Sequence, residues 1–168
     1  MIQRKPLEKI QTERTRKVIQ AQHEQFGQTI AISSCFGSSD IGQMTGFIAR
    51  QLVKEIPNAF MRCPLALWPE VEGPTQALLY DNFQVVIDGC KDRCLKKTFE
   101  KAGIKVDLSY ALDEDFHLEK GFGPDFDEQR MHKIAEQIRR DIENLIGSHS
   151  FKESDSKEQH PPRFTKGK

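Results

Sequence analysis

The chain has no net charge and no long apolar run, and each absence argues against a broad class of protein. Its 168 residues carry 25 Lys and Arg against 25 Asp and Glu. Without an excess of positive charge, a general nucleic-acid binder or a protein held on an anionic membrane surface is disfavoured. No stretch approaches the roughly 18 apolar residues of a membrane span, and the polar N-terminus has no apolar run behind it. We therefore expect a cytoplasmic protein with no nucleic-acid or membrane partner.

Cysteine is also scarce, and its distribution is uneven. The chain has only four cysteines, all between positions 35 and 94. In a reducing compartment, cysteines grouped in this way indicate metal or thiol chemistry rather than a disulfide framework. The length suits one domain with a substantial core.

Apolar runs rich in β-branched residues alternate with helical patterns, which is typical of βαβ units. The strands are predicted at residues 29–33, 59–61, 83–87 and 106–112. The helices are predicted at residues 42–56, 74–80, 91–101 and 127–146, with Gly103 ending the third. We expect an α/β fold: a three-layer Rossmann-like or flavodoxin-like domain with a mainly parallel four-stranded sheet in the order 2-1-3-4.

The two ends differ from this central pattern. Residues 1–28 are predicted to form an N-terminal helical extension, helix-prone at 7–25 but thinly apolar, which is available to pack on a partner protein or a second copy of the chain. Residues 29–147 form the predicted α/β domain. Residues 148–168 are polar and include Pro161-Pro162, so we predict a disordered C-terminal tail.

Three of the four cysteines come just after an apolar strand, where the chain passes into a loop. They are Cys35, Cys63 and Cys90. The carboxyl ends of parallel strands form the ligand-binding edge of an open α/β sheet, and neighbouring strands lie only about 4.8 Å apart. Cys94 follows Cys90 by four residues, which predicts a shared face of the helix that starts there. Four thiolates suit tetrahedral zinc or an iron–sulfur cluster, whereas a lone cysteine is usually a small buried apolar residue.

The sequence resembles a zinc-binding family named after its Asp-Gly-Cys (DGC) motif, present here as Asp88-Gly89-Cys90. The likeness runs from about residue 30 to residue 120 and includes Ser34-Cys35 with Gly42-Gln43, Met61-Arg62-Cys63, Cys94 and Glu119-Lys120. The resemblance implies a small α/β domain with no established enzymatic activity. Its implied zinc ligands are Cys35, Cys63, Cys90 and Cys94. The chain departs from the family where Pro64-Leu65-Ala66-Leu67-Trp68-Pro69 follows Cys63, so this loop is expected to differ in shape.

Other residues near the same edge are candidates for the ligand loop or for hydrogen bonds to the ligands: Ser38, Ser39, Gln43, Asp88, Gly89 and Lys120. The segment from Cys35 to Gln43 opens a helix, as an anion-binding phosphatase loop does. It lacks the arginine that clamps a phosphoryl group, and Asp40 would repel an anion. We therefore interpret Ser38, Ser39 and Asp40 mainly as turn and helix-cap residues.

The loop after the fourth predicted strand contains His117, Lys120 and the aromatic residues Phe116, Phe122 and Phe126. It could cover the cysteines as a lid. A surface loop with its aromatic side chains tucked into the core explains the same residues, and we favour that interpretation.

Three functions remain open from the sequence. The leading hypothesis is a zinc-binding protein with a structural, sensory or interaction role, because four cysteine ligands leave no open position for water. The alternative is an iron–sulfur or thiol-redox protein using the same cysteines, with a Cys90–Cys94 disulfide as one form. The third is a small-anion or soft-metal handling protein. We recognise no catalytic residues, so non-enzymatic metal binding is favoured over catalysis.

Overall fold

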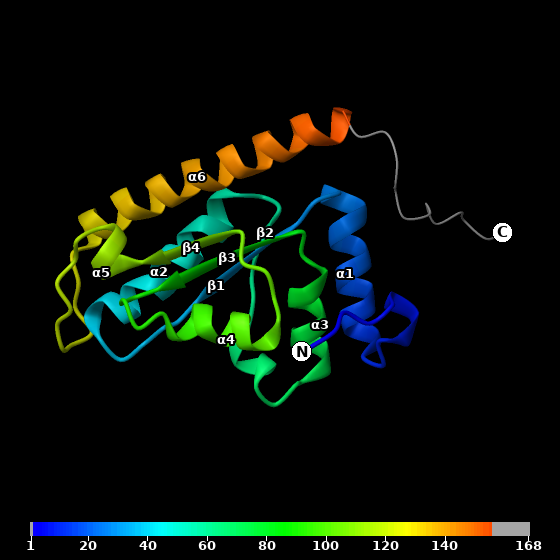
Figure 1. The fold of residues 1–168 in the computed structure, drawn as a ribbon, viewed down its shortest axis with the longest axis horizontal. Coiled ribbons are helices and arrows are strands. Elements are labelled where there is room, and N and C mark those ends of the chain that lie inside the picture. The colour runs from blue at the N-terminus through cyan, green and yellow to red at the C-terminus, as the bar shows by residue number, and fades with distance from the viewer. Residues whose placement is uncertain (1, 156–168) are drawn as a thin grey trace.

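The computed structural model describes residues 2–155, which form one four-stranded sheet covered by helices (Figure 1). The strands are β1 (Ile30–Ser34), β2 (Ala59–Met61), β3 (Phe83–Asp88) and β4 (Leu108–Ala111). All neighbours pair in parallel, and the spatial order is β2-β1-β3-β4. The predicted α/β class, the parallel pairing and the strand order are therefore confirmed.

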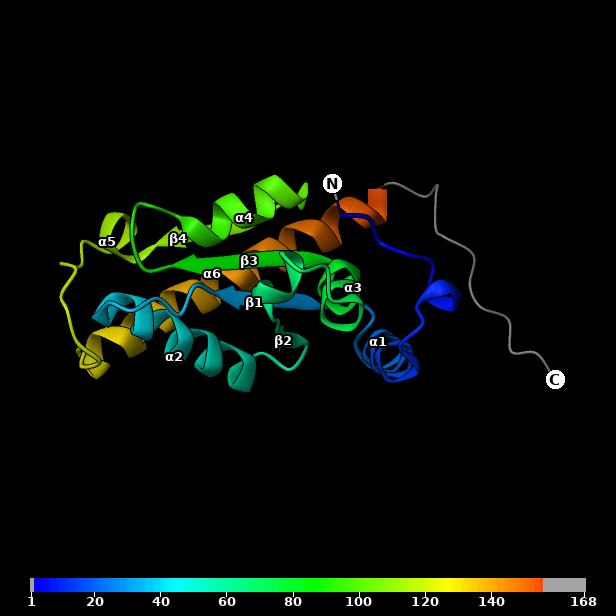
Figure 2. The ribbon, with the colours of Figure 1, turned by 90° about the horizontal axis from the view of Figure 1, so that it is seen from below.

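The two faces of the sheet carry separate apolar clusters. On one face, Ile30 and Ile32 of β1 pack with α2 (Asp40–Glu55) and α6 (Glu128–Asp155). On the other face, Val86 of β3 packs with Phe99 of α4 (Cys94–Ala102). Figure 2 shows α2 and α4 on opposite sides of the strands. The alternation of β-strand side chains divides one run of apolar residues between these two layers.

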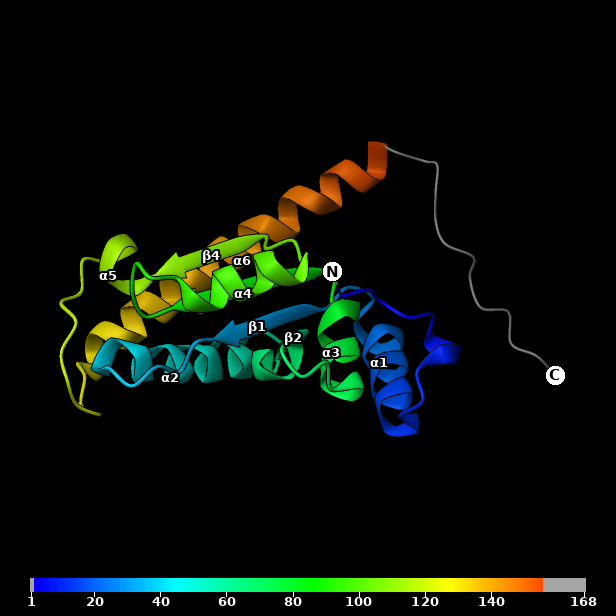
Figure 3. The same ribbon diagram turned by 60° about the horizontal axis from the view of Figure 1, so that its bottom comes forward.

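The N-terminal segment is divided into a 3-10 helix, η1 (Leu7–Lys9), and helix α1 (Glu13–Phe26). Figure 3 shows α1 beside α3 (Glu72–Tyr80), at the end of the molecule where the strands begin. Glu72 accepts the backbone N–H groups of Gln11 and Thr12 and pairs with Lys5 at 2.6 Å. Ile19 is the buried apolar residue of α1. The extension is thus attached to the domain at several points.

Three helices begin at other residues than the sequence predicted. Helix α2 begins at Asp40 and α3 at Glu72, two residues earlier than predicted in each case. Helix α4 begins at Cys94 and not at residue 91, and Arg93 before it has left-handed backbone angles (φ 47°). The prediction that Cys90 and Cys94 share a helix face is therefore wrong. Gly103 ends α4 in the left-handed region, as predicted.

Short helices and one long helix complete the fold. The 3-10 helix η2 (Pro64–Leu67) follows β2, and α5 (Leu112–Asp115) follows β4. Helix α6 continues to Asp155, beyond the apolar stripe that ends near residue 146. The prediction of a disordered segment at 148–168 falls, for residues 156–168, outside the part of the chain that the structure describes. No helix within residues 2–155 combines the length and apolar character that a membrane span requires.

Candidate functional site

The cysteines follow the three strands that lie side by side in the sheet. Cys35 comes directly after β1, Cys63 two residues after β2 and Cys90 two residues after β3. Because β1 lies between β2 and β3, the parallel order brings all three chain positions to the carboxyl edge. Cys94 reaches the same region as the first residue of α4. The structure thus gathers the four positions at one edge, as the strand pattern indicated.

Cys35 and the DGC turn are in direct contact. The backbone N–H of Gly89 donates to the Cys35 sulfur at 3.3 Å. Glycine is needed here because a Cβ on Gly89 would lie 2.8 Å from the backbone of Gly42. A Cβ on Gly42 would in turn lie 2.8 Å from the backbone of Gly37. We call Gly37, Gly42 and Gly89 the glycine junction; it joins the β1–α2 loop, the first turn of α2 and the DGC turn.

Thr45 contacts the Cys35 side chain, and no pattern in the sequence indicates this role. Its hydroxyl is fully buried, lies 3.7 Å from the Cys35 sulfur, and accepts the backbone N–H of Phe36 at 3.1 Å. The same hydroxyl donates to the Gly42 carbonyl at 2.7 Å. Because its only proton is used there, the Cys35 thiol is the donor in the sulfur–oxygen contact.

Asp88 of the DGC motif caps helix α4. Its two carboxylate oxygens accept the backbone N–H groups of Leu95 at 2.8 Å and Lys96 at 3.1 Å. Burial raises the pKa of Asp88, partly offset by these two N–H groups. The carboxylate therefore fixes where α4 begins, and with it the position of Cys94. It also occupies N–H groups that would otherwise stabilise a thiolate at this helix end.

Cys90 is partly buried and lies between an acidic and a basic side chain. Its thiol donates to Asp92 at 3.4 Å, and the Lys120 ammonium lies 3.7 Å from the sulfur. Burial raises the pKa of the Cys90 thiol, while the charge of Lys120 acts in the opposite direction. The structure thus brings Lys120 to the cysteine edge.

A contact between two distant loops positions Lys120. Asp40, at the start of α2, accepts the backbone N–H of the neighbouring Gly121 at 2.8 Å. A Cβ on Gly121 would lie 2.6 Å from the Asp40 carboxylate, so a larger residue here would displace that carboxylate. From the sequence, Asp40 was interpreted mainly as a turn and helix-cap residue, and its contact with Gly121 was not predicted.

The rest of the aromatic loop is divided between core and surface. Phe126 packs on Phe47 with ring centroids 5.1 Å apart, and Phe116 contacts Tyr110. Phe122 is 98% exposed. His117 has left-handed backbone angles, and its carbonyl accepts from Arg130. Two of the three aromatic side chains therefore anchor the loop, as a surface loop requires, while Lys120 is the residue that reaches a cysteine.

Two of the remaining candidates stabilise the β1–α2 loop. Ser39 caps α2 by accepting the Gly42 N–H at 3.1 Å, and Gln43 donates to the Gly37 carbonyl at 2.6 Å. Ser38 is exposed. Asp40 accepts the N–H of Ile41, so the first amides of this helix are already paired. This pairing leaves little free donor capacity for an anion.

Cys63 and Cys94 are exposed, in contrast to Cys35 and Cys90. The chain just before Cys63 is fixed by the nearly buried pair of Arg62 with Asp81, at 2.6 Å. The four thiols offer the donor type that zinc prefers. Within residues 2–155, however, no three His, Cys, Asp or Glu side chains stand close enough together to hold a metal ion. A closed site would require the two exposed thiols to turn inward.

The fold and the cysteine edge define a class: a three-layer parallel α/β protein with thiols at the carboxyl ends of adjacent strands. A model of the DGC domain matches residues 31–138, which is more than half of the chain. The chain belongs to the DGC domain family. Comparison with curated proteins gave no match, and neither did comparison with solved structures.

Proposed function

We propose that this protein binds one zinc ion through Cys35, Cys63, Cys90 and Cys94, in a structural, sensory or interaction role in the reducing cytoplasm. One observation carries the proposal: the Gly89 N–H of the DGC turn donates to the Cys35 sulfur across adjacent strands. The family motif is thereby joined to the first cysteine. The exposed pair, Cys63 and Cys94, supplies the other two donors from the loop after β2 and the start of α4.

Each of the two partly buried cysteines has one donor beside its sulfur that would stabilise a metal-bound thiolate. A zinc ion with four thiolates carries a net charge of −2, which needs donors nearby. The Gly89 N–H supplies one donor to Cys35, and the Lys120 ammonium supplies a charge beside Cys90. Such a site has no open coordination position, so a holding role fits better than hydrolysis.

Thiol-redox or iron–sulfur chemistry is the second candidate, and the exposure of Cys63 and Cys94 favours it. Exposed thiols are accessible to oxidants and to thiol partners. Asp88 weakens this case for Cys94, because its carboxylate takes the N–H groups of the next two residues. The small-anion hypothesis has less support, since the amides of Ile41 and Gly42 are already paired.

Metal analysis of protein purified without oxygen tests the proposal. We expect about one zinc per chain and no visible absorption. Cobalt substitution should give the intense sulfur-to-metal charge-transfer bands of a thiolate site, and Cys94→Ser should reduce them. Iron with acid-labile sulfide and a visible spectrum would transfer support to the redox candidate. Protein with no metal and four freely titrating thiols would contradict both metal-based hypotheses.

A further inference from the structure

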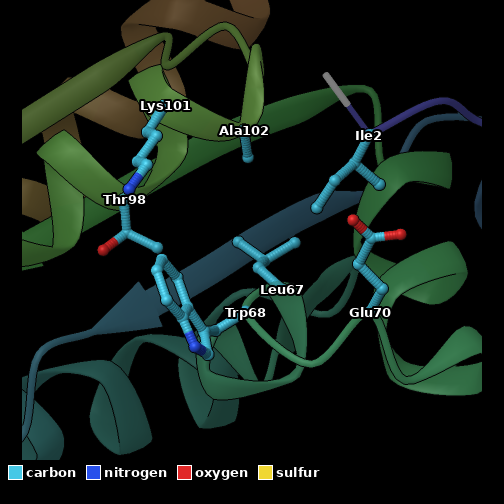
Figure 4. Close-up of a pocket in the computed structure, with 7 residues that line it drawn as sticks. All are labelled: Ile2, Leu67, Trp68, Glu70, Thr98, Lys101 and Ala102. Atoms are coloured by element: carbon cyan, nitrogen blue, oxygen red, sulfur yellow. The ribbon is translucent and has the colours of Figure 1, made fainter.

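A groove beside the exposed cysteines has features that the zinc proposal does not use. It lies between η2 and α4 and has a volume of about 230 Å³. Leu67, Ala102 and Ile2 supply its apolar lining from three separate segments, and Trp68 lies at one side (Figure 4). The volume is below the roughly 300–1,000 Å³ of sites for drug-sized ligands and cofactors. It suits a single large side chain of a partner better than a whole small molecule.

Large apolar side chains of η2 and of its C-cap are exposed, at the η2 side of the groove or next to it in the chain. Trp68 is 77% exposed and Leu65 82% exposed. The loop that carries them is fixed, because the Ala66 carbonyl accepts both the Val71 N–H and the Thr75 hydroxyl at 3.0 Å. Rigid, exposed aromatic residues are typical anchors of protein interfaces, since little entropy is lost when they bind.

The groove also has charges of opposite sign at its two sides. Lys101 places its ammonium 4.8 Å from the centre of the Trp68 ring, and Glu70 lies across the cavity (Figure 4). Among residues 2–155, neither side chain forms an ion pair. The Thr98 hydroxyl donates to the Cys94 carbonyl at 2.8 Å, so it can still accept from a ligand. A partner segment with an acidic and a basic residue flanking an apolar side chain would match these groups.

The groove and the exposed cysteines belong to the same two elements. Cys94, Thr98 and Lys101 follow one another at spacings of four and three residues, so they share one face of α4. Lys101 lies seven positions after Cys94, about 10 Å along the helix axis. Cys63 is the N-cap of η2, whose C-cap is Trp68. A protein docked in the groove would therefore lie next to both exposed thiols.

We propose that this groove docks an extended segment of a partner protein, with one large apolar residue between an acidic and a basic residue, and that the partner thereby covers Cys63 and Cys94. The docking site stands on its own, whereas its coupling to the cysteines rests on the proposed function. The apolar side chain occupies the cavity between Leu67 and Trp68. The acidic residue pairs with Lys101 and the basic residue with Glu70.

Selection of a phage-displayed library of random 12-residue peptides on the full chain tests the docking site. We expect an enriched pattern with an aromatic or leucine residue between an acidic and a basic residue. A synthetic peptide of that sequence should shift the fluorescence of Trp68, the only tryptophan in the chain. Trp68→Ala should weaken binding of the labelled peptide at least about tenfold, as loss of an interface anchor does.

Charge reversal makes the test specific. Lys101→Glu should lower the affinity for the same peptide at least about fivefold. Replacing the acidic residue of the peptide by lysine should restore binding to this variant. Phe122→Ala removes an even more exposed aromatic side chain elsewhere. Lys54→Glu reverses an exposed charge on α2, on the opposite side of the sheet. Both variants should bind the peptide as wild type does. No enriched pattern, or binding unchanged in Trp68→Ala, would overturn the proposal. A wild-type dimer that Trp68→Ala converts to a monomer would also overturn it, because a second copy would then be the occupant.

The coupling to the cysteines has a separate readout. The bound peptide should slow alkylation of Cys94 at least about threefold, and Trp68→Ala should bind zinc as wild type does. Peptide binding without any effect on Cys94 would contradict the coupling and leave the docking site standing. Peptide binding to a chain that takes up no metal would contradict the zinc proposal alone.

Discussion

The four cysteines divide into two pairs that the fold treats differently. Cys35 and Cys90 are partly buried and hydrogen-bonded, Cys35 to the Gly89 N–H and Cys90 to Asp92. Cys63 and Cys94 are exposed, and no side-chain hydrogen bond holds either thiol among residues 2–155. The inner pair is thus positioned by the core, and the outer pair only by the backbone that carries it. Substitutions in the inner pair should affect both folding and ligand binding, whereas those in the outer pair should affect binding alone.

The DGC motif accounts for much of this difference. Asp88 sets the start of α4, Gly89 allows the close approach to α2 and donates to Cys35, and Cys90 provides a thiol. Two of the three residues are therefore structural, and they place two other cysteines.

Replacement of an outer cysteine should have the largest effect on metal binding. Cys94→Ser should lower zinc affinity at least about 100-fold, because a serine hydroxyl stays protonated at neutral pH and is a poor ligand. Its circular-dichroism spectrum should match that of the wild type, since the buried apolar core of the described residues, from Ile10 to Ile142, contains no cysteine. Thermal melts of Cys94→Ser and wild type, each with and without a chelator, measure the stability that the fold retains without metal. Global unfolding of Cys94→Ser would show that the outer pair is structural after all.

An added methyl group at the glycine junction should have the largest effect on folding. Gly89→Ala places a Cβ 2.8 Å from the Gly42 backbone, so the two segments must separate. We expect a loss of about 2 kcal/mol in the free energy of unfolding, measured by urea denaturation. Gly147→Ala is the matched control, because a Cβ there meets nothing within 4 Å. Gly147 lies within α6, so its replacement by alanine should leave the free energy of unfolding unchanged or raise it by up to about 1 kcal/mol. Equal changes in the free energy of unfolding for the two substitutions would contradict the close backbone contact at the glycine junction.

Loss of the helix cap should have an intermediate effect. Asp88→Ala leaves the N–H groups of Leu95 and Lys96 without their acceptor, which should cost about 1–2 kcal/mol of stability. Asp88→Asn keeps one acceptor oxygen and should retain part of this contribution. Thermal melts of the three proteins in the presence of a chelator separate the cap from any metal. Identical melting temperatures would rule out the capping role.

The smallest effect is expected at Lys120. Lys120→Met removes a charge 3.7 Å from the Cys90 sulfur and should lower zinc affinity by less than about tenfold. The effect should diminish at high salt, because the pair is exposed. Lys91→Met, next to Cys90 in sequence, is the control, and it should bind zinc as wild type does. A competition titration with a chromophoric chelator measures the zinc affinity of the wild type and of both variants.

The sequence predicted the fold well because apolar periodicity determines it. The runs at residues 30–33 and 83–87 indicated buried strands, and their alternation with helices favoured parallel pairing. The order 2-1-3-4 was favoured because it places Cys35, Cys63 and Cys90 on neighbouring strands, and it is the order found. The boundary of α4 was wrong because a tertiary contact sets it: Asp88 reaches forward to Leu95, and Arg93 adopts left-handed angles. Propensity along the chain carries no information on that contact.

The placement of the cysteines at the sheet edge was predicted, but the contacts around them were not. The location of Cys35, Cys63 and Cys90 follows from strand ends and needs no structure. The hydroxyl of Thr45 and the pairing of Asp40 with Gly121 join residues 10 and 81 positions apart. No pattern in a single sequence indicates such contacts. The difference in exposure between the two cysteine pairs likewise depends on how the loops after β2 and β3 pack.

X-ray absorption at the zinc edge of the purified, fully loaded chain tests the central claim most directly. Four-cysteine coordination predicts one shell of four sulfur atoms at about 2.3 Å. Cys94→Ser should reduce the sulfur count by one, and Ser38→Ala should leave it unchanged. A shell dominated by nitrogen or oxygen, or a chain that retains no zinc after purification without oxygen, would contradict the account.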